Sequence, residues 1–215
     1  MNEVIRQLAA RRSVRAFEDR DIPGEVRAAI LEAAAQAPTA GNQQLYTILD
    51  VTDPQLKARL AETCDHQPFI AQAPMVLIFL ADVCKWLDAY REAGCEPRAP
   101  GAGDVMLAAS DAAIAAQNAV TAAWSLGVGS CYIGDVMERC EEHREMLNLP
   151  PHVFPAAMLV LGYPTEQQAR RPKPERFNMA DIVCENVYRR KDGPALREMF
   201  AGRCGARGYD AWMDA

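Results

Sequence analysis

An alanine-rich apolar stretch from residue 105 to residue 126 restricts the possible folds more than any other feature. Asp104 before it and Gly127 after it are a helix cap and a helix stop, so the stretch predicts one helix over 104–126. At 100° per residue its polar side chains fall within one stripe of about 120°, and the rest of its surface is apolar. The stripe consists of Ser110, Asp111, Gln117, Asn118, Thr121 and Ser125. These polar groups argue against a membrane span, so we expect a helix buried nearly all round, in a large core or at a dimer interface.

The other elements interleave strands and helices without a regular alternation. The apolar run 75–81 follows Pro74 and predicts a central strand that is buried on both faces. Further strands are expected at 46–51 and 154–161, and a short strand or loop at 129–135. Helices are expected at 3–10, 23–37, 84–93 and 138–147, and another opens at Asp53-Pro54. This order favours an α+β sandwich over a doubly wound sheet. We expect a single domain over 1–215, in which 177–215 is an extension with helical pieces that packs on a partner subunit.

Composition and motifs argue against several classes of function. A net charge of −6 and a pI near 5.2 argue against a nucleic-acid partner. The first residues lack the pattern of a secretory signal, and seven cysteines without a CxxC motif fit reduced thiols, so we expect a cytoplasmic protein. The three histidines show no ligand spacing, and no metal is expected. Motifs for a dinucleotide fold, a P-loop, a zinc protease and a serine hydrolase are absent from the sequence.

The basic stretch Arg11-Arg12-Ser13-Val14-Arg15 is the first candidate for a binding site. In an extended backbone Arg11, Ser13 and Arg15 project to one side, with Val14 on the other. Two guanidinium groups around a hydroxyl suit a phosphate monoester. A solvated basic turn would show the same residues.

Three other segments could complete such a site. A second basic cluster contains Arg171, Lys173 and Arg176. Between the two clusters lie the amide-rich loop 38–44 and the glycine-bounded segment 129–135, whose backbone can approach a flat ring closely.

Four segments of the sequence together resemble the FMN-dependent nitroreductase family. They are Arg-Arg-Ser-Val-Arg-Ala-Phe at 11–17, Ala-Pro-Thr-Ala-Gly-Asn-Gln-Gln at 37–44, Gly-Ser-Cys-Tyr-Ile-Gly-Asp at 129–135, and Leu-Gly-Tyr-Pro at 161–164 before the basic linker. The resemblance implies an α+β sandwich with a mostly antiparallel sheet, forming an intertwined homodimer with two FMN sites at the subunit interface. Where many members continue the Asn-Gln loop with Gln-Pro-Trp, this chain has Gln44-Leu45-Tyr46.

The resemblance also assigns roles to residues. It places the FMN phosphate and ribityl chain against Arg11, Arg12, Ser13 and Arg15, with Lys173 and Arg176 completing the phosphate site. The edge of the isoalloxazine ring would meet Pro38, Thr39, Ala40 and Asn42 of the other subunit, and the ring would lie against Ile133 and Gly134.

The resemblance implies that the flavin carries the chemistry and that the protein supplies no catalytic side chain. NADH or NADPH would reduce flavin N5, and an electron-poor acceptor such as a nitroaromatic or a quinone would then take the electrons in a ping-pong cycle. Trp86 and Tyr90 share a helix face and are candidates for the acceptor site, although core packing would explain them too. Reductive dehalogenation, oxygen-dependent flavin fragmentation and a non-catalytic flavin-binding protein remain alternatives.

Overall fold

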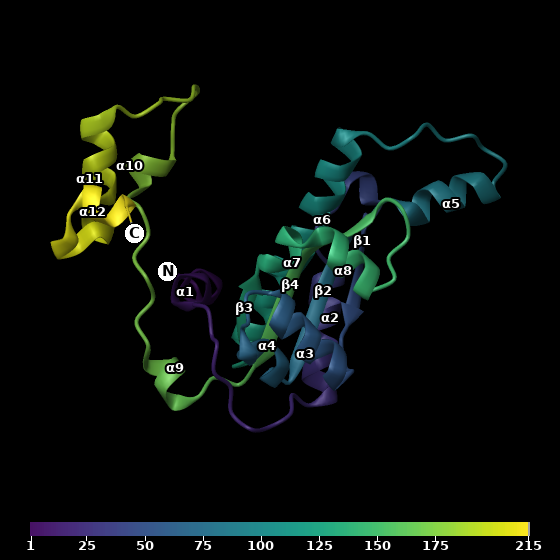
Figure 1. Ribbon diagram of the computed structural model, residues 1–215, viewed down its shortest axis with the longest axis horizontal. Coiled ribbons are helices and arrows are strands. Elements are labelled where there is room, and N and C mark those ends of the chain that lie inside the picture. Colours follow the sequence, from purple (N-terminus) through teal and green to yellow (C-terminus); the bar gives the residue numbers. More distant parts are fainter. Residues whose placement is uncertain (215) are drawn as a thin grey trace. The chain divides into compact units, whose positions relative to one another are not determined.

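The computed structural model describes residues 1–214 and divides the chain into two compact units (Figure 1). The first unit runs from Met1 to Arg171, and the second begins at Pro172.

A four-stranded antiparallel sheet forms the centre of the first unit. Its strands are β1 (Tyr46–Asp50), β2 (Met75–Asp82), β3 (Gly129–Ile133) and β4 (Val153–Gly162), in the order β1-β2-β4-β3. All eight residues of β2 are buried, which confirms the prediction of a central strand covered on both faces. The expected α+β architecture is confirmed.

Helices cover both faces of this sheet, and β2 shows how the sequence divides between them. Alternate side chains of a strand point to opposite faces. Met75, Leu77 and Phe79 pack in the cluster that contains α2 (Gly24–Ala35) and α6 (Ala102–Ser125). Val76 and Ile78 pack in the second cluster. That cluster lies under α3 (Pro54–Thr63), α4 (Pro68–Gln72), α7 (Asp135–Glu138) and α8 (Cys140–Met146).

The remaining elements of this unit lie around the sandwich. They are α1 (Glu3–Ala10), the single 3₁₀ turn η1 (Ala40–Asn42), α5 (Cys84–Glu92) and α9 (Glu166–Arg170). In Figure 1 α5 and the loop after it extend away from the sheet beyond β1. The helix expected over 138–147 is found as α8, which begins two residues later at Cys140, and Glu138 is instead the last residue of α7.

Helix α6 begins earlier than predicted, and within one chain it is only partly buried. Its N-cap is Gly101, while Asp104 lies three residues further on and accepts the Gly101 N–H at 2.7 Å, as in a capping box. Within one chain the helix is not buried all round, since Met106 is 70 % exposed and Leu107 and Ile114 are also exposed. The stripe of polar residues is not wholly solvated, because Asp111 is buried.

The second unit holds α10 (Met179–Ile182), α11 (Gly193–Cys204), the 3₁₀ turn η2 (Gly205–Arg207) and α12 (Tyr209–Met213). It has a small aromatic core that the sequence pattern did not indicate. Phe200 is its centre, with ring centroids 5.1–6.0 Å from those of its three aromatic neighbours. These neighbours are Phe177, Tyr209 and Trp212.

Candidate functional site

The basic stretch runs in an extended conformation along the outer edge of β3. Ser13 forms a parallel bridge with Ser130, and the Val14 N–H donates to the Ser130 carbonyl at 2.9 Å. Val14 is buried, Arg15 is exposed, and Arg11 and Ser13 are half-buried. The inward position of Val14 confirms the predicted alternation, which leaves the basic side chains on the other side of the segment.

The same stretch continues beside the end of β4. Phe17 pairs with Pro164, and the Thr165 N–H donates to the Ala16 carbonyl at 3.2 Å. Phe17 needs the glycine at 162, because a Cβ there would lie 2.7 Å from its ring. The segment is therefore held at two places, which fixes the backbone from which its basic side chains extend.

Two residues of the stretch bind α9 directly. The Arg12 guanidinium donates to the Ala169 carbonyl and lies over the Trp124 ring at 5.6 Å, and the Arg15 N–H donates to Gln168 Oε1 at 3.2 Å. Among the described residues, Arg12 Nε is buried without a hydrogen-bond partner.

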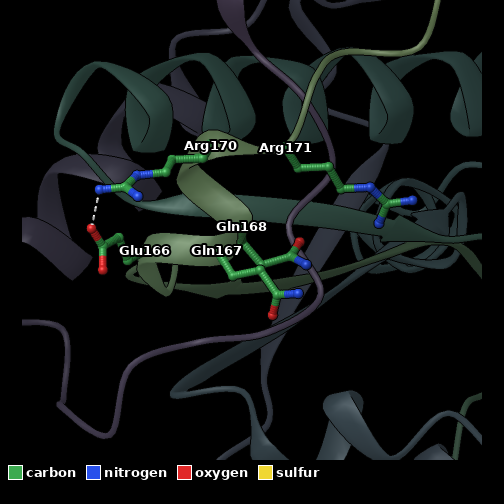
Figure 2. A pocket seen from close by; sticks show the side chains of 5 residues that line it. All are labelled: Glu166, Gln167, Gln168, Arg170 and Arg171. Carbon is green, nitrogen blue, oxygen red and sulfur yellow. Dashed lines mark hydrogen bonds and ion pairs between the residues drawn. The ribbon is translucent and has the colours of Figure 1, made fainter.

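A hollow of about 620 Å³ lies on α9, next to these contacts. Figure 2 shows Arg170 paired with Glu166, while Arg171 points away from that pair. The hollow is lined by Glu166, Gln167, Gln168, Arg170 and Arg171. Gln168 both lines the hollow and accepts the Arg15 N–H, so the hollow lies beside the basic stretch.

The far end of β3 carries the residues expected to lie against a ring. Ile133 is buried, while Gly134 is exposed and leads into α7. Earlier in the strand, burial raises the pKa of the Cys131 thiol, and the charges of Arg15 and Arg11 partly offset this effect. Cys131 of the glycine-bounded segment is thus close enough to the basic stretch for the two arginine charges to act on its thiol.

The amide-rich loop before β1 has an unusual backbone. Gly41, Asn42 and Gln44 all have positive φ, at 57°, 57° and 50°. The loop is held by Asp111 of α6, whose side chain accepts hydrogen bonds from Thr39 Oγ1 and from the Ala40 N–H at 3.0 Å. The sequence pattern places Asp111 in the polar stripe of its helix and gives no sign of its contact with this loop.

Trp86 and Tyr90 line one pocket, of about 500 Å³, between α5, the loop after it and the start of α6. Their ring centroids are 5.8 Å apart, and Trp86 Nε1 donates to the Gln43 carbonyl at 2.7 Å. Most of the pocket lining is apolar. It comprises Gln43, Leu45, Val83, Trp86, Leu87, Tyr90, Cys95, Pro97, Arg98, Pro100, Asp104 and Leu107. The pocket therefore adjoins the amide-rich loop.

The structure thus gathers the expected site residues into two groups. Arg11, Ser13, Ile133 and Gly134 lie at β3, whereas the 38–42 loop and the Trp86 pocket lie at β1. These strands are the two opposite edges of the sheet, three strand spacings or about 14 Å apart. Lys173 and Arg176 belong to the second unit. One chain therefore does not bring the two groups together.

Residues 1–214 hold neither a metal-binding cluster nor a membrane-spanning helix. No group of three or more His, Cys, Asp or Glu side chains in this range could hold a metal ion. None of the described helices is both long enough and apolar enough to cross a membrane.

The chain is thus an α+β sandwich with a basic segment along one sheet edge and an aromatic pocket at the other, and known proteins resemble it. The model of the nitroreductase family matches residues 8–163, and this chain belongs to that family. A Bacillus subtilis protein named FMN reductase (NAD(P)H) is 38 % identical over 176 residues, which cover 80 % of this chain and 70 % of the relative. The oxygen-insensitive NADPH nitroreductase of Salmonella typhimurium is 32 % identical and covers 100 % of this chain and 89 % of its own length.

Solved structures show the same relationship. The NADPH:FMN oxidoreductase from Vibrio harveyi, complexed with NAD⁺, superposes with a TM-score of 0.88 at 26 % identity, covering 99 % of this chain and 90 % of that one. This likeness extends beyond the residues that the family model matches.

Proposed function

We propose that this protein is an FMN-dependent oxidoreductase that passes two electrons from NADH or NADPH to an electron-poor acceptor, such as a nitroaromatic or a quinone. Relatives named as NAD(P)H-dependent FMN reductases and as an NADPH nitroreductase support this activity. The observation that carries the proposal is the fixed basic segment on β3, because it offers this family's cofactor a phosphate site.

The donors on that segment fit a phosphate. Arg11 and Arg15 carry guanidinium groups that can each donate two parallel hydrogen bonds to phosphate oxygens, and Ser13 adds a hydroxyl between them. Arg12 would act through its contact with Ala169, which holds α9 against the segment. In the proposal, Lys173 and Arg176 complete the phosphate site.

The flavin ring would lie at the end of β3, against Ile133 and Gly134. Gly134 has no side chain and nothing within 4 Å of the position that a Cβ would take, so its backbone is open to a flat ligand. Pro38, Thr39, Ala40 and Asn42 would edge the ring from a second copy of the chain.

A homodimer follows from this division of the site between two sheet edges. A single chain separates its own halves by the width of the sheet, so a complete site needs the β3 edge of one copy and the β1 edge of another. The exposed apolar residues of α6 and of the second unit, among them Met106 and Tyr188, would be covered in that dimer. We also propose that the protein acts in the cytoplasm.

Bound FMN would supply two-electron redox chemistry at its N5 atom, so the protein needs neither a nucleophile nor a general base. The chain's residues bind and orient. The basic segment holds the phosphate, the open backbone at Gly134 lets the ring approach, and the Trp86 pocket of the partner presents an aromatic wall to the acceptor. Flavin-dependent dehalogenation or fragmentation and a non-catalytic flavin protein would use the same cofactor site.

Anaerobic stopped-flow spectroscopy tests the proposal. The purified protein should be yellow, NADH or NADPH should bleach its flavin absorbance, and a quinone or a nitroaromatic should restore it. A bound flavin that neither nucleotide bleaches would identify a non-catalytic flavin protein, and a colourless protein that does not take up added FMN would contradict the cofactor assignment. Size-exclusion chromatography with light scattering tests the homodimer separately.

A further inference from the structure

Asp111 is a buried carboxylate that accepts hydrogen bonds from three groups of one loop. Its side chain is 3 % exposed, and the carboxylate accepts from Thr39 Oγ1, from the Ala40 N–H at 3.0 Å and from the Leu45 N–H at 3.2 Å. A buried carboxylate is tolerated only where donors replace its lost hydration. These bonds therefore join the middle of α6 to both ends of the 39–45 loop.

The loop has a backbone that needs such support. Asn42 and Gln44 lie in the left-handed region, which disfavours residues other than glycine. The Thr39 hydroxyl has one proton, which it donates to Asp111, so its oxygen is free to accept the Gln44 N–H at 2.8 Å. Asp111 thus orients the hydroxyl that holds Gln44.

The loop in turn fixes α5. Trp86 Nε1 donates to the Gln43 carbonyl at 2.7 Å, and Lys85 Nζ donates to the carbonyls of Tyr46 and Gln44 at 2.6 and 3.2 Å. Hydrogen bonds therefore lead from α6 through the loop to the indole that lines the 500 Å³ pocket.

We propose that Asp111 is a positioning residue: its carboxylate fixes the 39–45 loop and, through the Gln43 carbonyl, the indole of Trp86. The loop edge and the pocket wall are then set together by one side chain. The expected effects on flavin and acceptor binding rest on the proposed function, whereas the positioning of the loop and the indole by Asp111 does not.

The substitution Asp111→Asn tests the proposal, because an amide keeps the shape but replaces one acceptor oxygen by a donor. We expect the Trp86 indole N–H to exchange with solvent about tenfold faster, measured by NMR with Trp124 and Trp212 as internal references. The Trp86→Phe variant assigns the resonance. In the enzyme assay, the FMN dissociation constant and the acceptor KM should both rise about tenfold, with a smaller change in kcat.

Asn118→Ala is the matched control on the same helix. The Asn118 amide donates to the Ala33 carbonyl of α2 at 3.1 Å, away from the loop, so this variant should leave Trp86 exchange and FMN affinity unchanged. If Asp111→Asn fails to fold, Thr39→Val removes the hydroxyl link with little change in shape and should also speed Trp86 exchange. A folded Asp111→Asn or Thr39→Val protein with unchanged Trp86 exchange would overturn the proposal. A wild-type protein without flavin would refute the proposed function but leave this exchange test intact.

Discussion

Val14 fills the space directly above Gly129. A Cβ on Gly129 would lie 2.6 Å from Val14 Cγ2, closer than real carbon contacts allow. We expect Gly129→Ala to push the basic segment off β3 and to lower the free energy of unfolding by about 1–3 kcal/mol, measured by urea denaturation. FMN affinity should fall in parallel. Gly103→Ala is the control, since its Cβ would meet nothing within 4 Å; equal effects of the two substitutions would contradict this packing argument.

Removing both outer arginines of the basic segment should weaken FMN binding. A hydrogen bond to a charged group contributes about 1.5–3 kcal/mol, so Arg11→Ala with Arg15→Ala should cost several kcal/mol in flavin titrations. Dimerisation should change less, because neither guanidinium is part of the apolar surface. Arg170→Ala removes a nearby exposed arginine that is already paired with Glu166, and it should bind FMN nearly as the wild type does. Full flavin occupancy in the double variant would refute the phosphate site.

The indole of Trp86 should have two separable contributions to acceptor binding. Trp86→Phe keeps a ring against Tyr90 but loses the bond to the Gln43 carbonyl, while Trp86→Leu loses both. An aromatic contact contributes about 0.5–1.5 kcal/mol, so we expect KM for a quinone to rise in the order wild type, Phe, Leu, and by about tenfold in the last. Steady-state kinetics at saturating NADPH measure this. Identical KM values in all three proteins would assign Trp86 to packing alone.

An ion pair that lines the Trp86 pocket should be sensitive to acid. Arg98 donates to both carboxylate oxygens of Asp104, at 2.6 and 2.8 Å, and these bonds lower the pKa of Asp104 to about 2. A carboxyl whose pKa is lower in the folded state stabilises the fold above its unfolded pKa, near 3.8. That contribution is lost as the pH falls from about 4 to about 2. The difference in melting temperature between wild type and Asp104→Asn should therefore shrink over this range.

The control for this prediction is the Arg91–Asp88 pair on α5, which joins the same residue types at 3.1 Å within one helix. Asp88→Asn leaves the Arg98–Asp104 pair intact, so this variant should keep the wild-type dependence of the melting temperature on pH between pH 2 and pH 4. A pH-independent difference for Asp104→Asn would contradict the assigned pKa.

The sequence predicted those parts of the fold that follow from local patterns. The apolar run of β2, the alternation around Val14 and the glycine after α6 each depend on a few neighbouring residues, and each is found where expected. The start of α6 was placed wrongly, because Asp104 can serve equally as a cap or as the third residue of a capping box.

Contacts between distant residues could not be predicted in this way. Asp111 and Thr39 are separated by 72 positions, and nothing in either local pattern distinguishes a buried carboxylate from a solvated one. The aromatic core of the second unit was also missed. Its residues have no regular spacing because the chain turns through Gly205 and Gly208, both with positive φ, before Tyr209 returns to Phe200.

The separation of the two half-sites onto opposite sheet edges has a genetic consequence. A chain altered at Arg15 still presents an intact β1 edge, and a chain altered at Trp86 still presents an intact β3 edge. In the proposed homodimer, a mixed pair of these two chains would have one site with both defects and one site with both sound edges. Two impaired variants would therefore complement each other when co-expressed, and each mixed dimer would keep up to half the activity of a wild-type dimer.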